Sequence, residues 1–278
     1  VYKRQTTLYM LVLGITVPAV TYLSRRFTTK GLVIASLCLL CVGSAIDAVS
    51  WSFPVLIAGR VLQAVSAGVM MPLMITIVME SFPRDRQATV MGIAGIAMGF
   101  APNIGPTIGG WMIGVAGWRS FFVVLTACAL VLVALAILLV VRRPCADRTA
   151  RLDVLSLALS ALGFGGLLLG CSNASSVELA SPLIWAPVVA GVVFLVLFLH
   201  RQRRIDHPLI DLAIFDSSVF RAGFWAGNAL FASYLGITLV LPLYVEGLWG
   251  GTAFQAGLTL LPGTAAAFVM NPFAGYLT

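Results

Sequence analysis

The sequence contains very few charged residues, and this scarcity excludes most soluble architectures. Only 10% of its 278 residues are Asp, Glu, Lys or Arg, whereas 60% are hydrophobic. A soluble domain carries about 25% charged residues, because these side chains cover the surface that faces water. A chain of this length with so little charge cannot cover such a surface, so lipid must surround much of it.

Motifs typical of enzymes and metal proteins are also missing. No Walker-type phosphate loop occurs, so the sequence indicates no ATP-hydrolysing domain. The five cysteines form neither a disulfide framework nor a zinc pattern. The two histidines, His200 and His207, lie at a basic membrane edge, and no nucleophile stands beside a base. We therefore expect no enzyme, no catalytic residue, no cofactor and no metal site.

Nine apolar stretches can each cross a bilayer as a helix of about 20 residues. Helices are expected rather than barrel strands, because lipid cannot satisfy backbone polar groups and because polarity does not alternate along the stretches. The sequence therefore predicts an all-α, polytopic transmembrane helical bundle. The expected spans are residues 7–23, 31–49, 53–79, 88–115, 118–141, 153–172, 183–200, 219–244 and 253–278.

The distribution of basic residues predicts the orientation of these spans. Loops that carry many Lys and Arg residues stay in the cytoplasm, and thirteen of the 17 basic residues fall in one alternating set of loops. This bias accounts for the net charge of +7, so we expect a lipid bilayer as partner and no nucleic acid. The cytoplasmic set is Arg25, Arg26, Lys30, Arg84, Arg86, Arg142, Arg143, Arg148, Arg151, Arg201, Arg203, Arg204 and Arg221.

One arginine lies inside an expected span. Arg60 is about seven residues, or roughly 10 Å, from the outer end of the span 53–79. An arginine at the centre of a span costs about 2.5–3.5 kcal/mol, so Arg60 should face the protein interior or a wet cavity. Together with the adjacent Gln63 it is a candidate for proton coupling or substrate contact. The alternative is a structural arginine bonded to backbone carbonyls.

Glycines and prolines share one face of the span 88–115. At about 100° per residue, Gly95, Gly99, Pro102, Pro106 and Gly109 fall on a narrow stripe. Such a stripe lets another helix approach closely, and each proline bends its helix. A moving interface between two bundles would use this arrangement, and so would a static packing motif.

Two of these segments resemble motifs of the drug:proton antiporters of the major facilitator superfamily. The run from Gly105 and Pro106 to Gly109 and Gly110 resembles the antiporter signature of the fifth helix. The segment from Arg60 to Gln63 resembles the Arg-x-x-Gln-Gly motif of the fourth helix, with alanine in place of the glycine. The resemblance implies a major facilitator fold and a role for this arginine in proton coupling.

The first cytoplasmic loop resembles a third motif of the same family. Arg26 and Lys30 match the basic positions of its loop between helices two and three, whereas Arg25 occupies the position of the motif's aspartate. The lost acid removes an anchor for a charge network between helices. A solvated basic loop that serves topology alone is the alternative interpretation.

Two extra spans precede the linker. In this arrangement the central region resembles that of the fourteen-helix, EmrB/QacA branch of the family. The chain would then be a truncated fragment covering about helices two to ten. Acids near span ends, among them Asp47, are expected outside, and the proton-carrying acid is expected in the missing first helix. The expected regions are an N-terminal bundle at 1–141 lacking its first helix, two inserted helices with their preceding loop at 142–200, a cytoplasmic linker at 201–218, and the start of the C-terminal bundle at 219–278.

The resemblance implies a proton-coupled secondary transporter in the plasma membrane that exports small amphipathic compounds by alternating access. Small-molecule substrates and protons are then its partners, and an accessory envelope protein is unknown. Asn103, Asn228 and Asn271 are candidates for lining the central cavity, or for bonding across helices. An exporter of a native peptide, sugar or siderophore, or a membrane sensor without transport, are the alternatives.

Overall fold

The computed structural model describes most of the chain. The described residues are 2–141, 153–174, 177–178, 181–205, 208–252, 255–263, 265–266 and 270. Within these ranges, the side chains of residues 2–6, 96–97, 99–104, 106–107 and 113 are not described. Expected features that fall elsewhere, including Asn271, lie outside the described part of the chain.

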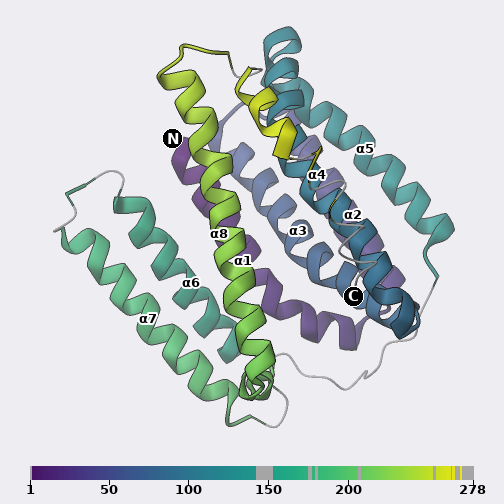
Figure 1. Ribbon diagram of the computed structural model, residues 1–278, viewed down its shortest axis with the longest axis vertical. Helices are drawn as coiled ribbons and strands as arrows, with labels where there is room; N and C mark the ends of the chain where they lie inside the picture. The colour runs from purple at the N-terminus through teal and green to yellow at the C-terminus, as the bar shows by residue number, and fades with distance from the viewer. Residues whose placement is uncertain are drawn as a thin grey trace. The chain divides into compact units, whose positions relative to one another are not determined.

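The described residues are helical and contain no strand, so the prediction of an all-α fold is confirmed (Figure 1). Seven helices are long and apolar enough to cross a membrane, by length and composition. Each agrees with an expected span to within a few residues. The elements are α1 (Tyr2–Arg26), α2 (Thr29–Ala48), α3 (Phe53–Ser81), α4 (Arg84–Ala116), α5 (Trp118–Leu139), α6 (Val154–Ala174), α7 (Pro182–Gln202), η1 (Leu212–Asp216) and α8 (Ser218–Gly247).

Polar side chains begin several of these helices. The hydroxyls of Thr28, Ser181 and Ser217 accept hydrogen bonds from the first turns of α2, α7 and α8, respectively. The Asp153 carboxylate does the same for α6, because it accepts a bond of 3.1 Å from the backbone N–H of Ser156. These caps satisfy amides that have no partner inside the helix, and they mark where each apolar segment starts.

The chain divides into two compact units, of which the first comprises Val1–Met74 and Phe122–Leu212. In this unit α1 packs against α6 and also against α3, where a side chain at Gly68 would meet Thr16 of α1. The Thr7 hydroxyl donates a hydrogen bond of 3.2 Å to Ser172, which ties α1 to α6 a second time. Hydrogen bonds between α2 and α3 complete the set of helix contacts that position the candidate site.

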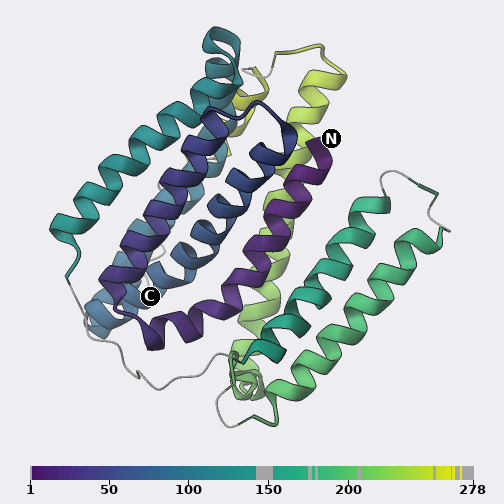
Figure 2. The same ribbon diagram turned by 180° about the vertical axis from the view of Figure 1, so that it is seen from behind.

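Within the first unit, α6 and α7 form a hairpin whose two backbones touch (Figure 2). A methyl group added at Gly166 would lie 2.8 Å from the Cα of Gly191, and one added at Gly191 would lie 2.7 Å from the carbonyl oxygen of Gly163. A methyl group added at Gly170 would lie 2.8 Å from the carbonyl oxygen of Ile184. Only glycine permits this approach. Lipid supplies no hydrophobic driving force between helices, so the close packing at these glycines stabilises the hairpin instead.

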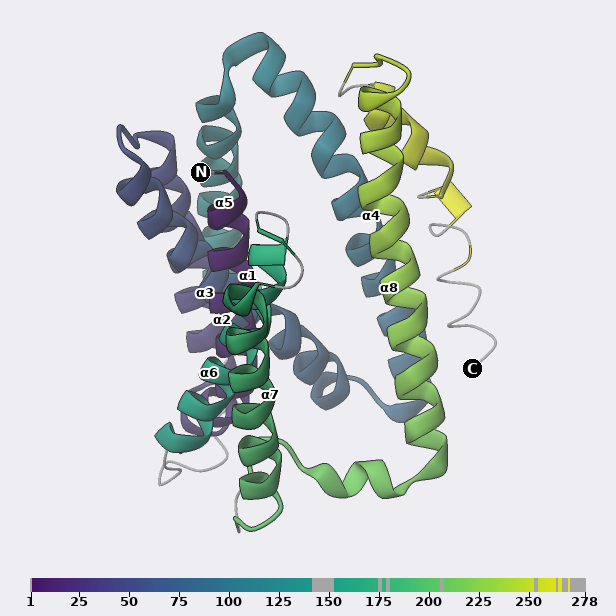
Figure 3. The same ribbon diagram turned by 90° about the vertical axis from the view of Figure 1, so that its left-hand side faces the viewer.

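The second unit comprises Ile75–Phe121 and Ala213–Thr278. It contains α4, which begins just after α3 ends, and α8, which runs as one uninterrupted helix (Figure 3). The Gln87 side-chain amide donates to the carbonyl of Met79 in the last turn of α3 and to that of Phe82 just after the helix. Gly117, with φ of 78°, makes the turn from α4 into α5 in a backbone conformation that favours glycine.

Candidate functional site

Helices α2 and α3 cross so closely that their backbones are in contact. A methyl group added at Gly43 would lie 2.7 Å from the carbonyl oxygen of Gly59, and one added at Gly59 would lie 2.6 Å from that of Gly43. Such a crossing tolerates no side chain at either position. It brings the polar residues near the end of α2 against the beginning of α3.

Four polar residues meet beside this crossing, and we call them the buried cluster: Ser44, Asp47, Arg60 and Gln63. Ser44 and Asp47 of α2 are fully buried, and Gln63 of α3 is 3% exposed. The Gln63 amide donates hydrogen bonds of 2.9 Å to Asp47 Oδ2 and 3.2 Å to Ser44 Oγ. Its oxygen accepts a bond of 3.3 Å from Arg60. Gln63 therefore links the cation to the anion.

The charged groups of the buried cluster are close but not tightly bonded. Arg60 Nε lies 3.9 Å from Asp47 Oδ2, which is within ion-pair range but too long for a hydrogen bond. Asp47 Oδ1 and Arg60 Nε are the buried side-chain atoms of the described residues without a hydrogen-bond partner. Buried polar atoms are nearly always bonded, so these two leave unused bonding capacity next to a charge pair.

The guanidinium of Arg60 faces other helices of the unit. It lies over the ring of Phe122 of α5, 5.0 Å from the centroid, and over the ring of Tyr9 of α1, 5.9 Å away. Phe122 is buried, whereas the Arg60 side chain is 31% exposed. Aromatic faces attract a cation, and they hold Arg60 toward α1 and α5 while part of it stays accessible.

This arrangement provides a protonatable carboxyl beside a permanent cation within the apolar helices. An ionised carboxylate in such surroundings needs its partner, because an isolated buried charge is very costly. A neutral carboxyl attracts the guanidinium far less. Protonation of Asp47 would therefore weaken its hold on Arg60, and movement of Arg60 would favour protonation.

Sequence reasoning singled out Arg60 and Gln63 but missed Asp47, which it placed outside as one acid near a span end. Two other acids also lie near helix ends, Glu80 in α3 and Glu246 in α8, and both are exposed. The signal for Asp47 was its position just before the short loop of residues 49–52. This loop joins two antiparallel helices, so it brings the end of α2 against the start of α3. Helix periodicity within one segment does not contain this information.

The glycine- and proline-rich segment lies within one continuous helix, α4. A side chain added at Gly105 would meet nothing within 4 Å, whereas one added at Gly109 would just reach the Phe121 ring, 4.0 Å away. Gly95 and Gly110 are half-buried. The surroundings of Gly99 and the side chains of Pro102, Asn103 and Pro106 are not described.

The remaining predicted residues lie far from the buried cluster in the chain. Arg26 is exposed at the end of α1, and the Lys30 ammonium donates a bond of 2.6 Å to the carbonyl of Ile137 in α5. Asn228 is exposed on α8 and its amide donates to its own helix, at the carbonyl of Phe224. The structure therefore brings Arg60 and Gln63 together.

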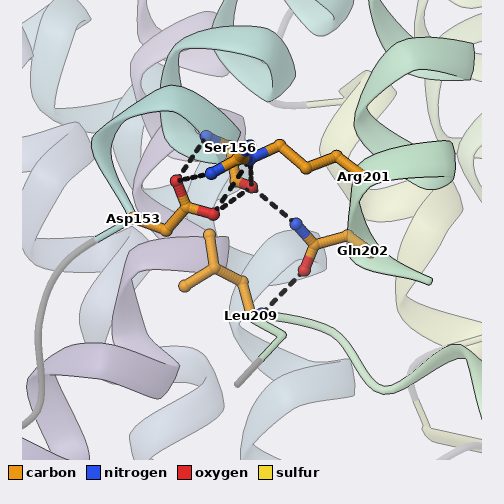
Figure 4. Close-up of polar contacts among 5 residues, drawn as sticks. All are labelled: Asp153, Ser156, Arg201, Gln202 and Leu209. Carbon is orange, nitrogen blue, oxygen red and sulfur yellow. Dashed lines mark hydrogen bonds and ion pairs between the residues drawn. The ribbon is translucent and has the colours of Figure 1, made fainter. Parts of the chain in front are cut away.

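A second polar group closes the open end of the α6–α7 hairpin, and we call it the hairpin latch (Figure 4). Arg201 donates to both carboxylate oxygens of Asp153, at 3.2 and 3.1 Å. Gln202 donates to the Ser156 hydroxyl at 2.8 Å, while its oxygen accepts from the backbone N–H groups of Leu209 and Ile210. The latch therefore joins α6, α7 and residues 209–210 of the linker.

The electrostatics of the latch favour an ionised Asp153. Partial burial acts to raise the pKa of this carboxyl. The hydrogen bonds from Arg201 and Ser156 and the attraction of Arg201 outweigh that effect, so its pKa lies below its ordinary value. A carboxylate that is bonded on both oxygens and strongly ionised suits a structural joint.

The chain is similar to known membrane transporters along almost its whole length. The sequence profile of the Major Facilitator Superfamily matches residues 5–278. The uncharacterized MFS-type transporter YcnB of Bacillus subtilis is 36% identical over 97% of this chain and 57% of its own length. The lincomycin resistance protein LmrB of Listeria monocytogenes is 34% identical over 98% and 58%, respectively.

A more distant relative extends the same pattern. The multidrug resistance protein B homolog of Mycobacterium tuberculosis is 30% identical over 96% of this chain and 50% of its own length. The chain therefore spans about half to three-fifths of the length of these relatives. Two of these three relatives are named for resistance, one to lincomycin and the other to several drugs.

Proposed function

The chain belongs to the Major Facilitator Superfamily, and from that premise we propose that it is part of a proton-coupled exporter of small amphipathic compounds. It is a multi-pass protein of the plasma membrane, with seven described helices suited to spanning it. Relatives named for resistance to lincomycin and to several drugs support antibiotic-like molecules as the substrate class. We place the chain in the fourteen-helix branch, with α6 and α7 as the inserted pair.

The observation that carries the proposal is the charge pair inside the helices. Arg60 and Asp47 lie on facing helices, Gln63 bonds to both, and the rings of Tyr9 and Phe122 face the guanidinium. Ionisable residues within membrane spans are costly, and they mark ion or substrate pathways. Well-packed apolar residues often replace a buried ion pair without loss of stability, so helix packing alone is a weak reason for a pair at this position.

The proposed mechanism is alternating access, in which two bundles rock around a central cavity while protons flow inward and substrate leaves. The smooth, glycine-rich face of α4 serves as the surface on which one bundle moves against the other. Asn103, Asn228 and Asn271 remain proposed cavity residues. Arg26 and Lys30 act at the cytoplasmic end, where Lys30 bonds to α5.

Export driven by a pH gradient tests this proposal. Inside-out vesicles that contain the complete gene product are given an acidic interior. Uptake of a fluorescent amphipathic cation, driven by this pH gradient, is then followed. We expect uptake that a protonophore abolishes, and a loss of at least about tenfold in Arg60→Gln. Arg119→Gln, which alters an arginine at the start of α5, is the control and should retain uptake. Unchanged uptake in Arg60→Gln would remove this arginine from the mechanism.

A further inference from the structure

The carboxyl of Asp47 has a setting that no other described acid shares. It is fully buried, whereas Glu80 and Glu246, the other acids within the candidate spans, are exposed. One of its oxygens receives Gln63 and faces Arg60, and the other, Oδ1, is buried without a hydrogen-bond partner. These surroundings therefore suit a carboxyl that gains and loses a proton better than they suit a carboxylate that stays ionised.

We propose that Asp47 is the residue at which this protein binds and releases the transported proton, with Arg60 as the cation that it pairs with when ionised. This inference rests on the proposed function, since it names the proton site of that exporter. In one half-cycle the Asp47 carboxylate accepts a proton from water on the outer side, and its attraction for Arg60 falls. In the other half-cycle it returns that proton to water on the inner side, and the ion pair forms again.

The surroundings of the carboxyl limit what else could carry this proton. Among the described residues, the charged or titratable groups that face Asp47 from neighbouring helices are Arg60 of α3 and, across the guanidinium, Tyr9 of α1. Arginine does not lose its proton in proteins, and a tyrosine hydroxyl ionises near pH 10. Ser44 and Gln63 are uncharged. Asp47 is therefore the group of the buried cluster that can titrate during transport.

The geometry also supplies a route by which proton binding could reach the rest of the unit. Arg60 is held by Gln63 and by the rings of Tyr9 and Phe122, so it contacts α1 and α5 as well as α2. When Asp47 is neutral, the guanidinium loses its anion, and its 31% exposed side chain can turn away from these partners toward a substrate or water. Charge on one helix thereby changes contacts on three others.

The test separates driven transport from exchange in the complete gene product. Asp47→Asn keeps the size and the Gln63 contact of the side chain but cannot ionise. We expect uptake driven by the pH gradient to fall at least about tenfold, while exchange of labelled for unlabelled substrate without a gradient stays within about twofold. Glu246→Gln, which neutralises the penultimate residue of α8 as Asp47→Asn does that of α2, should leave both activities unchanged.

A double variant distinguishes a proton site from a structural ion pair. In Asp47→Asn/Arg60→Gln no charge is left unpaired, so a purely structural pair would regain driven uptake, and that result would overturn the inference. We expect instead that the double variant folds, as judged by size-exclusion chromatography, and still lacks driven uptake. Loss of exchange together with driven uptake in Asp47→Asn would also overturn it.

Direct measurement of protons completes the test. In weakly buffered detergent solution, addition of substrate to the wild-type protein should release protons that a pH-indicator dye detects, and Asp47→Asn should release none. Release that persists in the variant would place the proton site elsewhere. If the wild-type protein itself shows neither gradient-driven uptake nor proton release, the proposed function fails, which differs from failure of Asp47 alone.

Discussion

Two aspartate–arginine pairs join helices within the first unit, and they differ in geometry. In the hairpin latch, Arg201 makes two hydrogen bonds to Asp153, at 3.2 and 3.1 Å. In the buried cluster, Arg60 approaches Asp47 at 3.9 Å, and buried atoms on both sides lack partners. A bidentate pair holds one arrangement strongly, whereas a loose pair can change partners at lower cost. Bonding geometry therefore distinguishes a structural ion pair from one suited to transport.

Truncating the arginine of each pair should give the largest difference in stability. Arg60→Ala leaves the Asp47 carboxylate buried without its cation, which we expect to cost on the order of 3 kcal/mol. Arg201→Ala affects a pair at a partly exposed helix end, where water replaces much of the loss, so we expect about 1 kcal/mol or less. Unfolding by SDS in mixed micelles measures both values, and equal losses would contradict the comparison.

Adding a methyl group where α2 and α3 cross should cause the next largest loss of stability. A methyl group at Gly59 would lie 2.6 Å from the carbonyl oxygen of Gly43, beside Asp47. We therefore expect Gly59→Ala to destabilise the protein by about 1–3 kcal/mol through overpacking. Gly14→Ala in α1 is the matched control, because its methyl group would meet nothing within 4 Å. A similar loss in both variants would show that the close crossing is not responsible.

Removing the glutamine of the latch should have a smaller effect that appears first in the linker. Gln202→Ala leaves the backbone N–H groups of Leu209 and Ile210 without their acceptor, at a cost of about 1–2 kcal/mol. We expect faster trypsin cleavage after Arg203 and Arg204. Gln87→Ala also removes an amide that bonds to backbone, but at an exposed site, and should leave linker cleavage unchanged.

The smallest expected effect is the pH dependence that the latch contributes. Because the pKa of Asp153 in the folded protein lies below its ordinary value of about 3.9, its contribution to stability is complete above that value. The contribution is lost as the pH falls below about 4 and through the folded pKa. Thermal midpoints from pH 7 to pH 3 should therefore converge for the wild type and Asp153→Asn, and a constant gap would contradict this sign.

Much of the fold could be predicted because a bilayer restricts the choices. Apolar length identified the spans, and in the described part of the chain eight of them form helices with nearly the expected bounds. The contact between Asp47 and Arg60 could not be predicted in the same way, because it depends on how α2 and α3 cross at Gly43 and Gly59. Arg60 was conspicuous as a charge inside a span, whereas Asp47 looked like an ordinary acid near a helix end.

The latch escaped prediction for a related reason. Asp153, Arg201 and Gln202 are typical polar residues at helix ends, and composition does not distinguish solvated residues from bonded ones. Their partnership depends on the hairpin, which brings residues 48 positions apart in the chain into contact. The predicted roles of the α4 glycines and of the asparagines remain predictions.

The glycine contacts between α6 and α7 bear on how the protein is made. Both partners of this interface leave the ribosome before α8 does, because α7 ends at Gln202 and α8 begins only at Ser218. Two helices whose backbones fit each other can pair in lipid as soon as both have been released. The hairpin can therefore assemble during translation as a finished piece, and the latch would then fix the point from which the later half of the chain starts to fold.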